Sequence, residues 1–275
     1  MTDLLDLEAD LALARQAVAA AGALTLAHFH AAPKSWYKGP GQVVTEADVA
    51  VDNLLHDMLR AARPDYGWLS EERVDDRSRT RCTRVWVVDP IDGTRAFADG
   101  VPQFAISVAL VEGGEPLVGV VLNPATEECF ETRRGGGASM NGQSLSVSGC
   151  TELADADLLS SRTEMKRRHW PTMIPEATFT TIGSLAYKLA LVASGRFDGL
   201  VSLRPSHDWD IAAAQLLVRE AGGRLTDAAG RPIALNRDPP RHFGLAAAGT
   251  DSLHAAIVAR LEAASLAAGS DLGHM

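Results

Sequence analysis

The chain has 275 residues, 46% hydrophobic and 22% charged, which is enough for one large or two modest folded domains. Its net charge of −9 argues against a binder of nucleic-acid polymers or anionic membranes, because both need a basic face. The three cysteines form no C-x-x-C pair, no stretch suits a membrane span and the N-terminus is acidic, so we expect a cytoplasmic protein.

The first half of the chain reads as two helices followed by an antiparallel meander of strands. Leucine and alanine recur at three- and four-residue steps and predict a helix over 3–31, which ends before Pro33. The Gly-containing segment 38–42 predicts a mobile loop, and a second amphipathic helix is expected over 46–62. The charged segment 74–84 reads as a loop, and β-branched runs predict strands at 85–88, 104–111, 117–122, 128–132 and 145–147.

Beyond Cys150 strands and helices alternate, which is typical of an α/β layer. We therefore expect an α+β domain over 1–149 and an α/β domain over 150–275. The basic run 162–168 is interpreted as a solvated surface or a substrate-facing segment. The predicted elements are strands at 156–160, 198–203, 223–226 and 243–248, and helices at 183–194, 210–221 and 251–267.

The segment from Trp86 to Phe97 carries the strongest chemical signal. An apolar strand leads into Asp89 and Asp92, which are three residues apart, and Gly93 and Thr94 follow where a helix could begin. Carboxylates are hard oxygen ligands that suit Mg²⁺, and free N–H groups at a helix start bind phosphate oxygens. The alternative interpretation of the same residues is an Asp-rich turn after a strand.

Three further acids lie at the ends of predicted elements. Asp48 follows Thr45 at capping-box spacing, and Asp210 lies at the start of an apolar helix, so each has a helix cap as its alternative role. Glu71 follows a short apolar pair and a serine and would by itself be solvated. If these five acids converge they repel one another, and two divalent ions about 3.5–4 Å apart would both supply the missing charge and clamp a phosphate.

Four motifs in this order resemble the signatures of the inositol monophosphatase superfamily. Asp89-Pro-Ile-Asp92-Gly-Thr94 looks like D-P-[IL]-D-G-T, and Trp209-Asp210-Ile-Ala-Ala looks like W-D-x-A-[AG]. Ser70-Glu71-Glu72 and Val44-Thr45-x-x-Asp48 match two further motifs, so the resemblance covers roughly residues 5 to 265. It implies a layered αβαβα sandwich, mixing α+β and α/β character. It also implies Mg²⁺-dependent, lithium-sensitive hydrolysis of small phosphate monoesters by a homodimer.

The resemblance also implies a role for each acid. Glu71, Asp89 and the carbonyl of Ile91 would hold one metal ion, and Asp89, Asp92 and Asp210 a second. Glu71 would share a third ion through water, which makes two to three Mg²⁺ ions and gives Glu71 a catalytic role. Asp48 and Thr94 would orient and deprotonate the attacking water, while the N–H groups of Gly93 and Thr94 would hold the phosphate. Most of these metal ligands would come from the expected domain 1–149, and the expected domain 150–275 would complete the site. Lys38 matches a basic position near it.

The substrate is not resolved by these motifs. The default expectation is a small phosphorylated metabolite of the inositol-phosphate kind. The flank Thr94-Arg95-Ala96-Phe97 looks like histidinol-phosphatases and some 3′(2′),5′-bisphosphate nucleotidases, and residues 183–188 resemble the nucleotidase branch. A metal- or phosphate-binding regulatory protein is the alternative outside the enzymes. The candidate substrate-binding residues are Ser184, Lys188, Arg204, His207 and Asp208.

Overall fold

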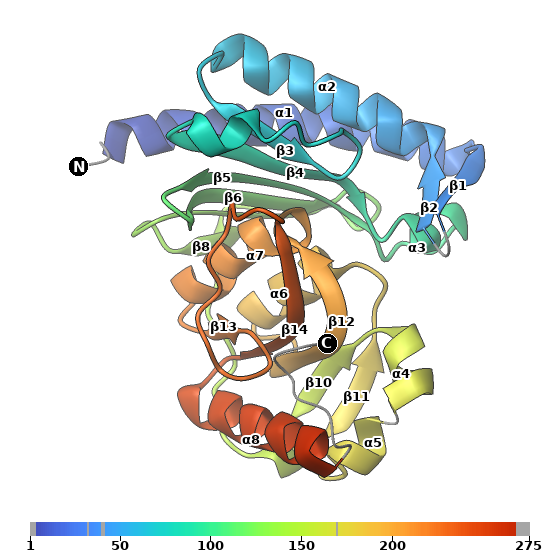
Figure 1. Cartoon of the computed structure of the whole chain (residues 1–275), viewed down its shortest axis with the longest axis vertical. Helices are drawn as coiled ribbons and strands as arrows, with labels where there is room; N and C mark the ends of the chain where they lie inside the picture. The colour runs from blue at the N-terminus through green and yellow to red at the C-terminus, as the bar shows by residue number, and fades with distance from the viewer. Residues whose placement is uncertain (1–3, 32, 40–41, 169, 268–275) are drawn as a thin grey trace.

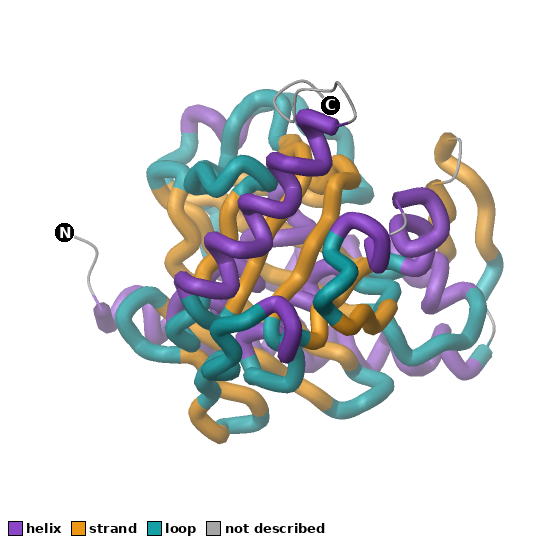
Figure 2. Tube along the Cα trace, turned by 90° about the horizontal axis from the view of Figure 1, so that it is seen from below, coloured by secondary structure: helices purple, strands orange, loops and turns teal. Residues whose placement is uncertain are grey.

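The computed structural model describes residues 4–31, 33–39, 42–168 and 170–267, and stacks helices and sheets in five layers (Figure 1). Helices α1 (Leu4–His30) and α2 (Glu46–Ala62) cover one face of a seven-stranded sheet, and α6 (Leu185–Ala193) and α7 (Asp208–Glu220) cover the other. A five-stranded sheet follows, with α8 (Asp251–Ala267) on its outer face, as the view from below also shows (Figure 2). The expected αβαβα sandwich is confirmed.

The seven-stranded sheet contains the predicted meander. Its strand order is β3-β4-β5-β6-β7-β8-β9, and only β3 and β4 run parallel. Valine-rich runs form its central strands, because β-branched side chains pack well on a pleated surface that is covered on both faces. The strands are β3 (Gly67–Ser70), β4 (Arg84–Asp92), β5 (Ala105–Glu112), β6 (Glu115–Asn123), β7 (Glu128–Arg133), β8 (Ala138–Met140) and β9 (Gln143–Ser144).

The five-stranded sheet is mixed, in the order β11-β10-β12-β14-β13. Strand β10 runs parallel to β11 and β12, while β14 runs antiparallel to β12 and β13. Strand β12, the central strand of this sheet, continues directly into α7, and its end points toward the seven-stranded sheet (Figure 1). The strands are β10 (Asp157–Ser160), β11 (Thr178–Thr181), β12 (Gly199–His207), β13 (Arg224–Thr226) and β14 (Arg241–Ala248).

Two local predictions were wrong. The expected loop at 38–42 belongs to a hairpin of β1 (Ser35–Gly39) and β2 (Gln42–Thr45), and Pro40 and Gly41 lie outside the described residues. Residues 145–147 form no strand. The Leu145 N–H donates to the Ala138 carbonyl and the Val147 N–H donates to the Ala221 carbonyl, so the segment does not pair with one neighbouring strand. No element was predicted for 161–176, where the structure holds α4 (Arg162–Arg168) and α5 (Trp170–Met173), or for β11, which follows them. Strand β3 and the short helices η1 (Ser78–Arg81) and η2 (Leu153–Asp155) also had no prediction, whereas α3 (Thr94–Ala98) begins where a helix start was expected.

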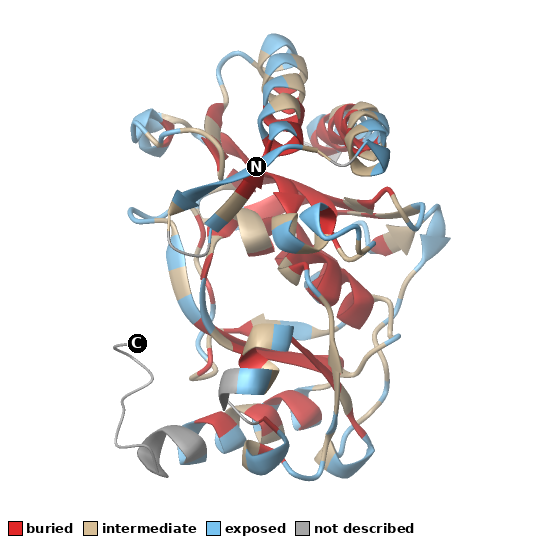
Figure 3. Ribbon diagram, turned by 90° about the vertical axis from the view of Figure 1, so that its right-hand side faces the viewer, coloured by how far each residue is buried: buried red, intermediate tan, exposed pale blue. Residues whose placement is uncertain are grey.

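The largest core lies between the two sheets, around α6 and α7. Residues 186 and 189–193 of α6 are almost fully buried, and so are residues 211–214 of α7 (Figure 3). This core joins residues of 1–149 with residues of 150–275, so the expected domain division stays a prediction. A second core packs α1 and α2 on the outer face of the seven-stranded sheet. No described helix combines the length and apolar character that crossing a bilayer requires.

Candidate active site

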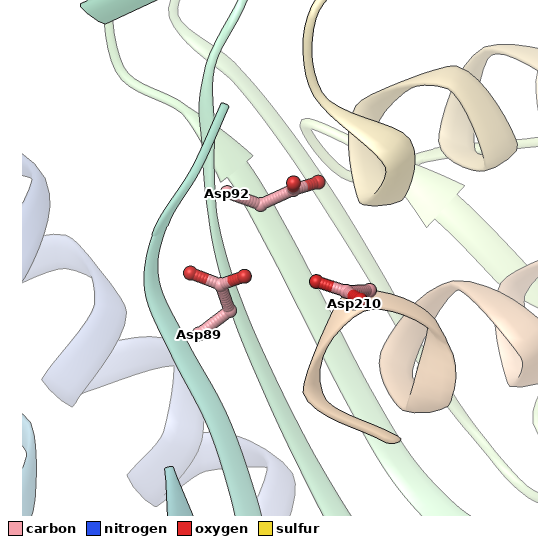
Figure 4. Close-up of side chains that lie close together, drawn as sticks. All are labelled: Asp89, Asp92 and Asp210. Atoms are coloured by element: carbon pink, nitrogen blue, oxygen red, sulfur yellow. The ribbon is translucent and has the colours of Figure 1, made fainter. Parts of the chain in front are cut away.

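Three carboxylates meet between the two halves of the chain. Asp89 and Asp92 come from the end of β4, and Asp210 comes from the first turn of α7 (Figure 4). Each offers a carboxylate oxygen, and these oxygens all lie within 4.8 Å of one another. Spacing of this kind allows one divalent cation to contact all three groups.

An irregularity in β4 brings Asp89 and Asp92 together. Side chains three residues apart on a regular strand point to opposite faces of the sheet. Here Asp89 pairs with Ser107 and Asp92 pairs with Ala105, so the three steps along β4 match only two steps along β5. The extra residue is a β-bulge at Pro90 and Ile91. It suits proline, which cannot donate to a ladder, and it turns both carboxylates to the same side.

The electrostatics of the cluster fit a bound cation. Asp89 is 1% exposed, and its Oδ2 has no hydrogen-bond partner among the described residues. Burial and the charges of Glu71, Asp92 and Asp210 raise the pKa of Asp89 well above its usual range. Burial and Asp210 raise the pKa of Asp92 to about 6. A divalent ion would supply positive charge to the cluster and would give Asp89 Oδ2 a binding partner.

Asp92 is held in place by the start of α6. Ser184 is the N-cap residue of this helix and is fully buried. Its Oγ donates to Asp92 Oδ2 at 2.5 Å, and the Ala186 N–H donates to the same oxygen at 2.6 Å. Lys188 is also buried, its Nζ donates to the Ile182 carbonyl at 3.3 Å, and burial lowers its pKa. Ser184 therefore orients Asp92 directly, whereas Lys188 interacts with Asp92 through its charge.

Asp48 and Thr94 form a hydrogen-bonded pair beside the cluster. Thr94 Oγ1 lies 3.1 Å from Asp48 Oδ1 and 3.0 Å from the Ile91 carbonyl. The other carboxylate oxygen of Asp48 accepts from the Thr45 N–H at 2.8 Å and from Thr45 Oγ1 at 2.5 Å. Asp48 is therefore a member of a helix capping box and a partner of Thr94 at the same time. Burial is the main reason that its pKa is raised.

Glu71 follows β3 and lines the same cavity. Burial and the charge of Asp210 raise its pKa to about 8. Asp52 of α2 holds the residues on either side of Glu71 in place. It accepts hydrogen bonds from Ser70 Oγ and from Arg73 Nε, the latter at 2.5 Å. Lys38 forms an ion pair with the neighbouring Glu72 and also lowers the pKa of Glu71.

Gly93 and Thr94 shape the turn between β4 and α3. Gly93 has φ +92°, a conformation that side chains disfavour, and a Cβ there would lie 2.9 Å from the Gln103 carbonyl. Thr94 is the first residue of α3, so its N–H has no carbonyl partner within the helix. Both residues line the cavity.

The cavity has a volume of about 470 Å³, which is in the range of small-molecule sites. Glu71, Asp92, Asp210 and the turn at Gly93 line it. Its lining also includes Arg162 and Lys166 from α4 and Arg204 from β12. The basic run 162–168 was thus partly a cavity wall; the side chains of Arg167 and Arg168 are outside the description. Ser161-x-x-Glu164 has capping-box spacing and was the sequence signal for α4.

The five candidate substrate residues separate into two groups. Arg204 lines the cavity, whereas the lining does not include Ser184, Lys188, His207 or Asp208. The His207 ring stacks on Trp209 at 4.5 Å between centroids. Asp208 is fully buried; it accepts from the Asn236 N–H at 2.6 Å, and its Oδ1 lies 2.6 Å from His242 Nε2. Asp208 thereby connects the start of α7 to β14 and the segment before it.

Comparisons with known proteins agree on one family. The chain matches the inositol monophosphatase family over residues 6–266. It is 41% identical over 198 residues to an inositol-1-monophosphatase of Mesorhizobium japonicum, covering 69% of this chain and 74% of that protein. It is 36% identical over 204 residues to the Nus factor SuhB of Escherichia coli, covering 70% and 74%. The solved Thermotoga maritima IMPase superposes with a TM-score of 0.82 at 29% identity, covering 96% and 99%.

Proposed function

The chain belongs to the inositol monophosphatase family and is a phosphatase, and from this premise we propose that it hydrolyses a small phosphorylated metabolite with the help of Mg²⁺. The observation that supports this most is the meeting of three carboxylates beside the Asp48–Thr94 pair. A protein that only binds metal needs the carboxylates but has no use for a threonine hydroxyl hydrogen-bonded to a buried acid.

We assign the metal to the acidic cluster. Asp89, Asp92 and Asp210 would hold it, with Glu71 and the Ile91 carbonyl completing the ligand set for two to three Mg²⁺ ions. When bound, such ions supply positive charge for the phosphate and lower the pKa of a water molecule. Ser184 and Ala186 orient Asp92 for this task by bonding to its Oδ2.

The chain's own residues would move the proton and hold the phosphate. The attacking water donates to Thr94 Oγ1, whose proton passes to Asp48 Oδ1 at 3.1 Å. Thr45 fixes the other oxygen of Asp48, and burial raises the pKa of this acid, which makes it a better base. The N–H groups of Gly93 and Thr94 would bind phosphate oxygens during the transfer. No covalent phosphoenzyme is required.

Three substrate classes stay open within this chemistry. A relative at 41% identity is named an inositol-1-monophosphatase, which supports inositol phosphates as the default. The 3′(2′),5′-bisphosphate nucleotidase and histidinol-phosphatase alternatives rest on the flanks of the sequence motifs. We also propose that lithium inhibits the enzyme, that it forms a homodimer and that it is located in the cytoplasm.

The decisive experiment measures phosphate release with and without millimolar Mg²⁺. The substrates are inositol 1-phosphate, adenosine 3′,5′-bisphosphate and histidinol phosphate, assayed side by side. We expect Asp89→Asn to lower Mg²⁺-dependent kcat at least about 100-fold, because it removes a buried ligand charge. Asp57→Asn is the matched control, since its side chain is 81% exposed and lies outside the cavity lining.

A regulatory role is the alternative outcome. A relative at 36% identity is named a Nus factor, so a binding partner other than a substrate is the competing proposal for this chain. Near-normal turnover of Asp89→Asn in Mg²⁺ would contradict the metal assignment. No Mg²⁺-dependent release from any of the three esters, or from p-nitrophenyl phosphate, would favour the regulatory role.

A further inference from the structure

The cavity that Glu71, Asp92 and Asp210 line also has a cationic lining. Arg162, Lys166 and Arg204 line it, and we call these three residues the cationic wall. Seventeen ion pairs join other charged residues of the described chain, yet none includes a residue of the cationic wall. The chain has a net charge of −9, so three cations at one cavity that form no ion pair with a described acid are unexpected.

The helix that carries two of these cations is arranged so that both share a face. Arg162 and Lys166 are four residues apart on α4, and such like-charged pairs destabilise a helix. Both are exposed. Glu164, between them, is rotated about 200° to the opposite face, where it is 3% exposed. The helix therefore presents its cations to the cavity and buries its acid.

Glu164 fastens α4 to the strand that carries the third cation. Its Oε1 accepts from the Leu203 N–H at 2.7 Å, and its Oε2 accepts from Ser202 Oγ at 3.0 Å. The pairing of β12 with β14 shifts between Ser202 and Pro205, so Leu203 and Arg204 form a bulge. The buried carboxylate satisfies the N–H that this bulge leaves unpaired. One buried acid thus joins the helix that carries two of the cations to the strand that carries the third.

We propose that the substrate carries a second anionic group, a phosphate or a carboxylate, which the cationic wall binds while the scissile phosphate lies at the acidic cluster. This inference rests on the proposed phosphatase function and narrows its substrate class. Cations recognise an anion with charge-assisted hydrogen bonds, whereas neutral polyol hydroxyls need no such charge. A cationic leaving group such as histidinol would be repelled, so the histidinol-phosphatase alternative is disfavoured.

Matched substrate pairs test the proposal. Adenosine 3′,5′-bisphosphate is compared with adenosine 3′-monophosphate, and 3-phosphoglycerate with glycerol 3-phosphate, by kcat/KM in Mg²⁺. We expect the member with the second anion to be preferred about ten-fold or more, mostly through KM. The nucleotide pair reports a second phosphate and the glycerol pair reports a carboxylate. A preference in either pair supports the proposal.

Variants assign the preference to the cationic wall. Arg204→Gln and Arg162→Gln should each lower the ratio of kcat/KM within a pair at least about five-fold, and Arg204→Lys should restore part of it. Arg219→Gln is the control, because this arginine forms an exposed ion pair with Glu115 outside the cavity lining. Thermal unfolding of each variant verifies that the protein remains folded.

A binding measurement separates this proposal from the proposed function. Calorimetry with Asp89→Asn in Mg²⁺ records the affinity for both members of each pair without turnover. If no ester is hydrolysed by the wild type but the second anion still strengthens binding, the phosphatase proposal fails and the anion site stands. Hydrolysis or binding without any preference for the second anion in either pair overturns the anion site.

Discussion

Thr94 and Asp48 illustrate how single residues combine structural and chemical roles. Thr45 holds one oxygen of Asp48 as part of a helix cap, and the second oxygen faces the Thr94 hydroxyl at 3.1 Å. The cap therefore orients the acid that would receive a proton. A structural role for Asp48 at the helix start does not compete with a catalytic role, because its two oxygens serve different partners.

A substitution at Thr94 tests the proton path at the residue scale. Thr94→Ala removes the hydroxyl between water and Asp48, and we expect kcat to fall about 10²–10⁴-fold with little change in KM. Thr94→Ser keeps the hydroxyl and should retain activity within about ten-fold. Steady-state phosphate release with both variants provides the measurement. Equal kcat values for the alanine and serine variants would refute the role of the hydroxyl.

At the scale of elements, the site depends on how closely α7 approaches the seven-stranded sheet. A Cβ at Gly119 of β6 would lie 2.7 Å from the Ala213 carbonyl of α7, so the helix backbone rests directly on the strand. Helix α7 carries Asp210 in its first turn, whereas Asp89 and Asp92 belong to the sheet. The distance between helix and sheet thus sets the distance between the cluster's halves.

Gly119→Ala tests this dependence. Overpacking at a backbone contact is expected to destabilise the protein by about 1–3 kcal/mol, and displacement of α7 should weaken Mg²⁺ activation several-fold. Urea denaturation and the Mg²⁺ dependence of phosphate release provide the two readouts. Gly149→Ala is the control, because no heavy atom lies within 4 Å of its added Cβ, and a change within about 0.5 kcal/mol is expected. An equal effect of both substitutions would contradict the close-packing argument.

At the scale of the whole molecule, folding gathers acids that the unfolded chain keeps apart. The pKa of Glu71 rises from 4.5 to about 8, that of Asp92 rises to about 6, and that of Asp89 rises well above its usual range. Repulsion and burial are the causes, and both exist only in the folded state. Assembling these acids therefore lowers the folding stability of the metal-free protein when they are ionised.

The resulting pH dependence has a definite sign. Because the folded protein binds these protons more tightly than the unfolded chain does, the metal-free protein should lose stability as pH rises from about 4.5 to 8. In EDTA we expect Tm to fall across this range, and Mg²⁺ should raise Tm more at pH 8 than at pH 6, since protons compete with the ion. Glu71→Gln should flatten the slope in EDTA. An unchanged slope in that variant would remove Glu71 as its source.

The sequence by itself determined most of the long helices and central strands, and the list of acids. Helical periodicity placed the helix at 46–62, alternating and β-branched runs placed the meander, and the order of four motifs indicated the family. These features are local, since they depend on residues close together in the chain. The roles of the individual acids as metal ligands stay proposals for the mutations above.

Only the tertiary structure decided which side chains face the cavity. Asp89 and Asp92 share a side because pairing with β5 leaves an extra residue in β4, and a pattern along one strand contains no information about its partner's register. Lys188 and Asp208 were candidates for binding substrate but are buried, whereas Arg162 and Lys166 of the basic run line the cavity. Burial depends on packing between segments far apart in the sequence, here α4, β12 and α7, so local patterns could not assign it.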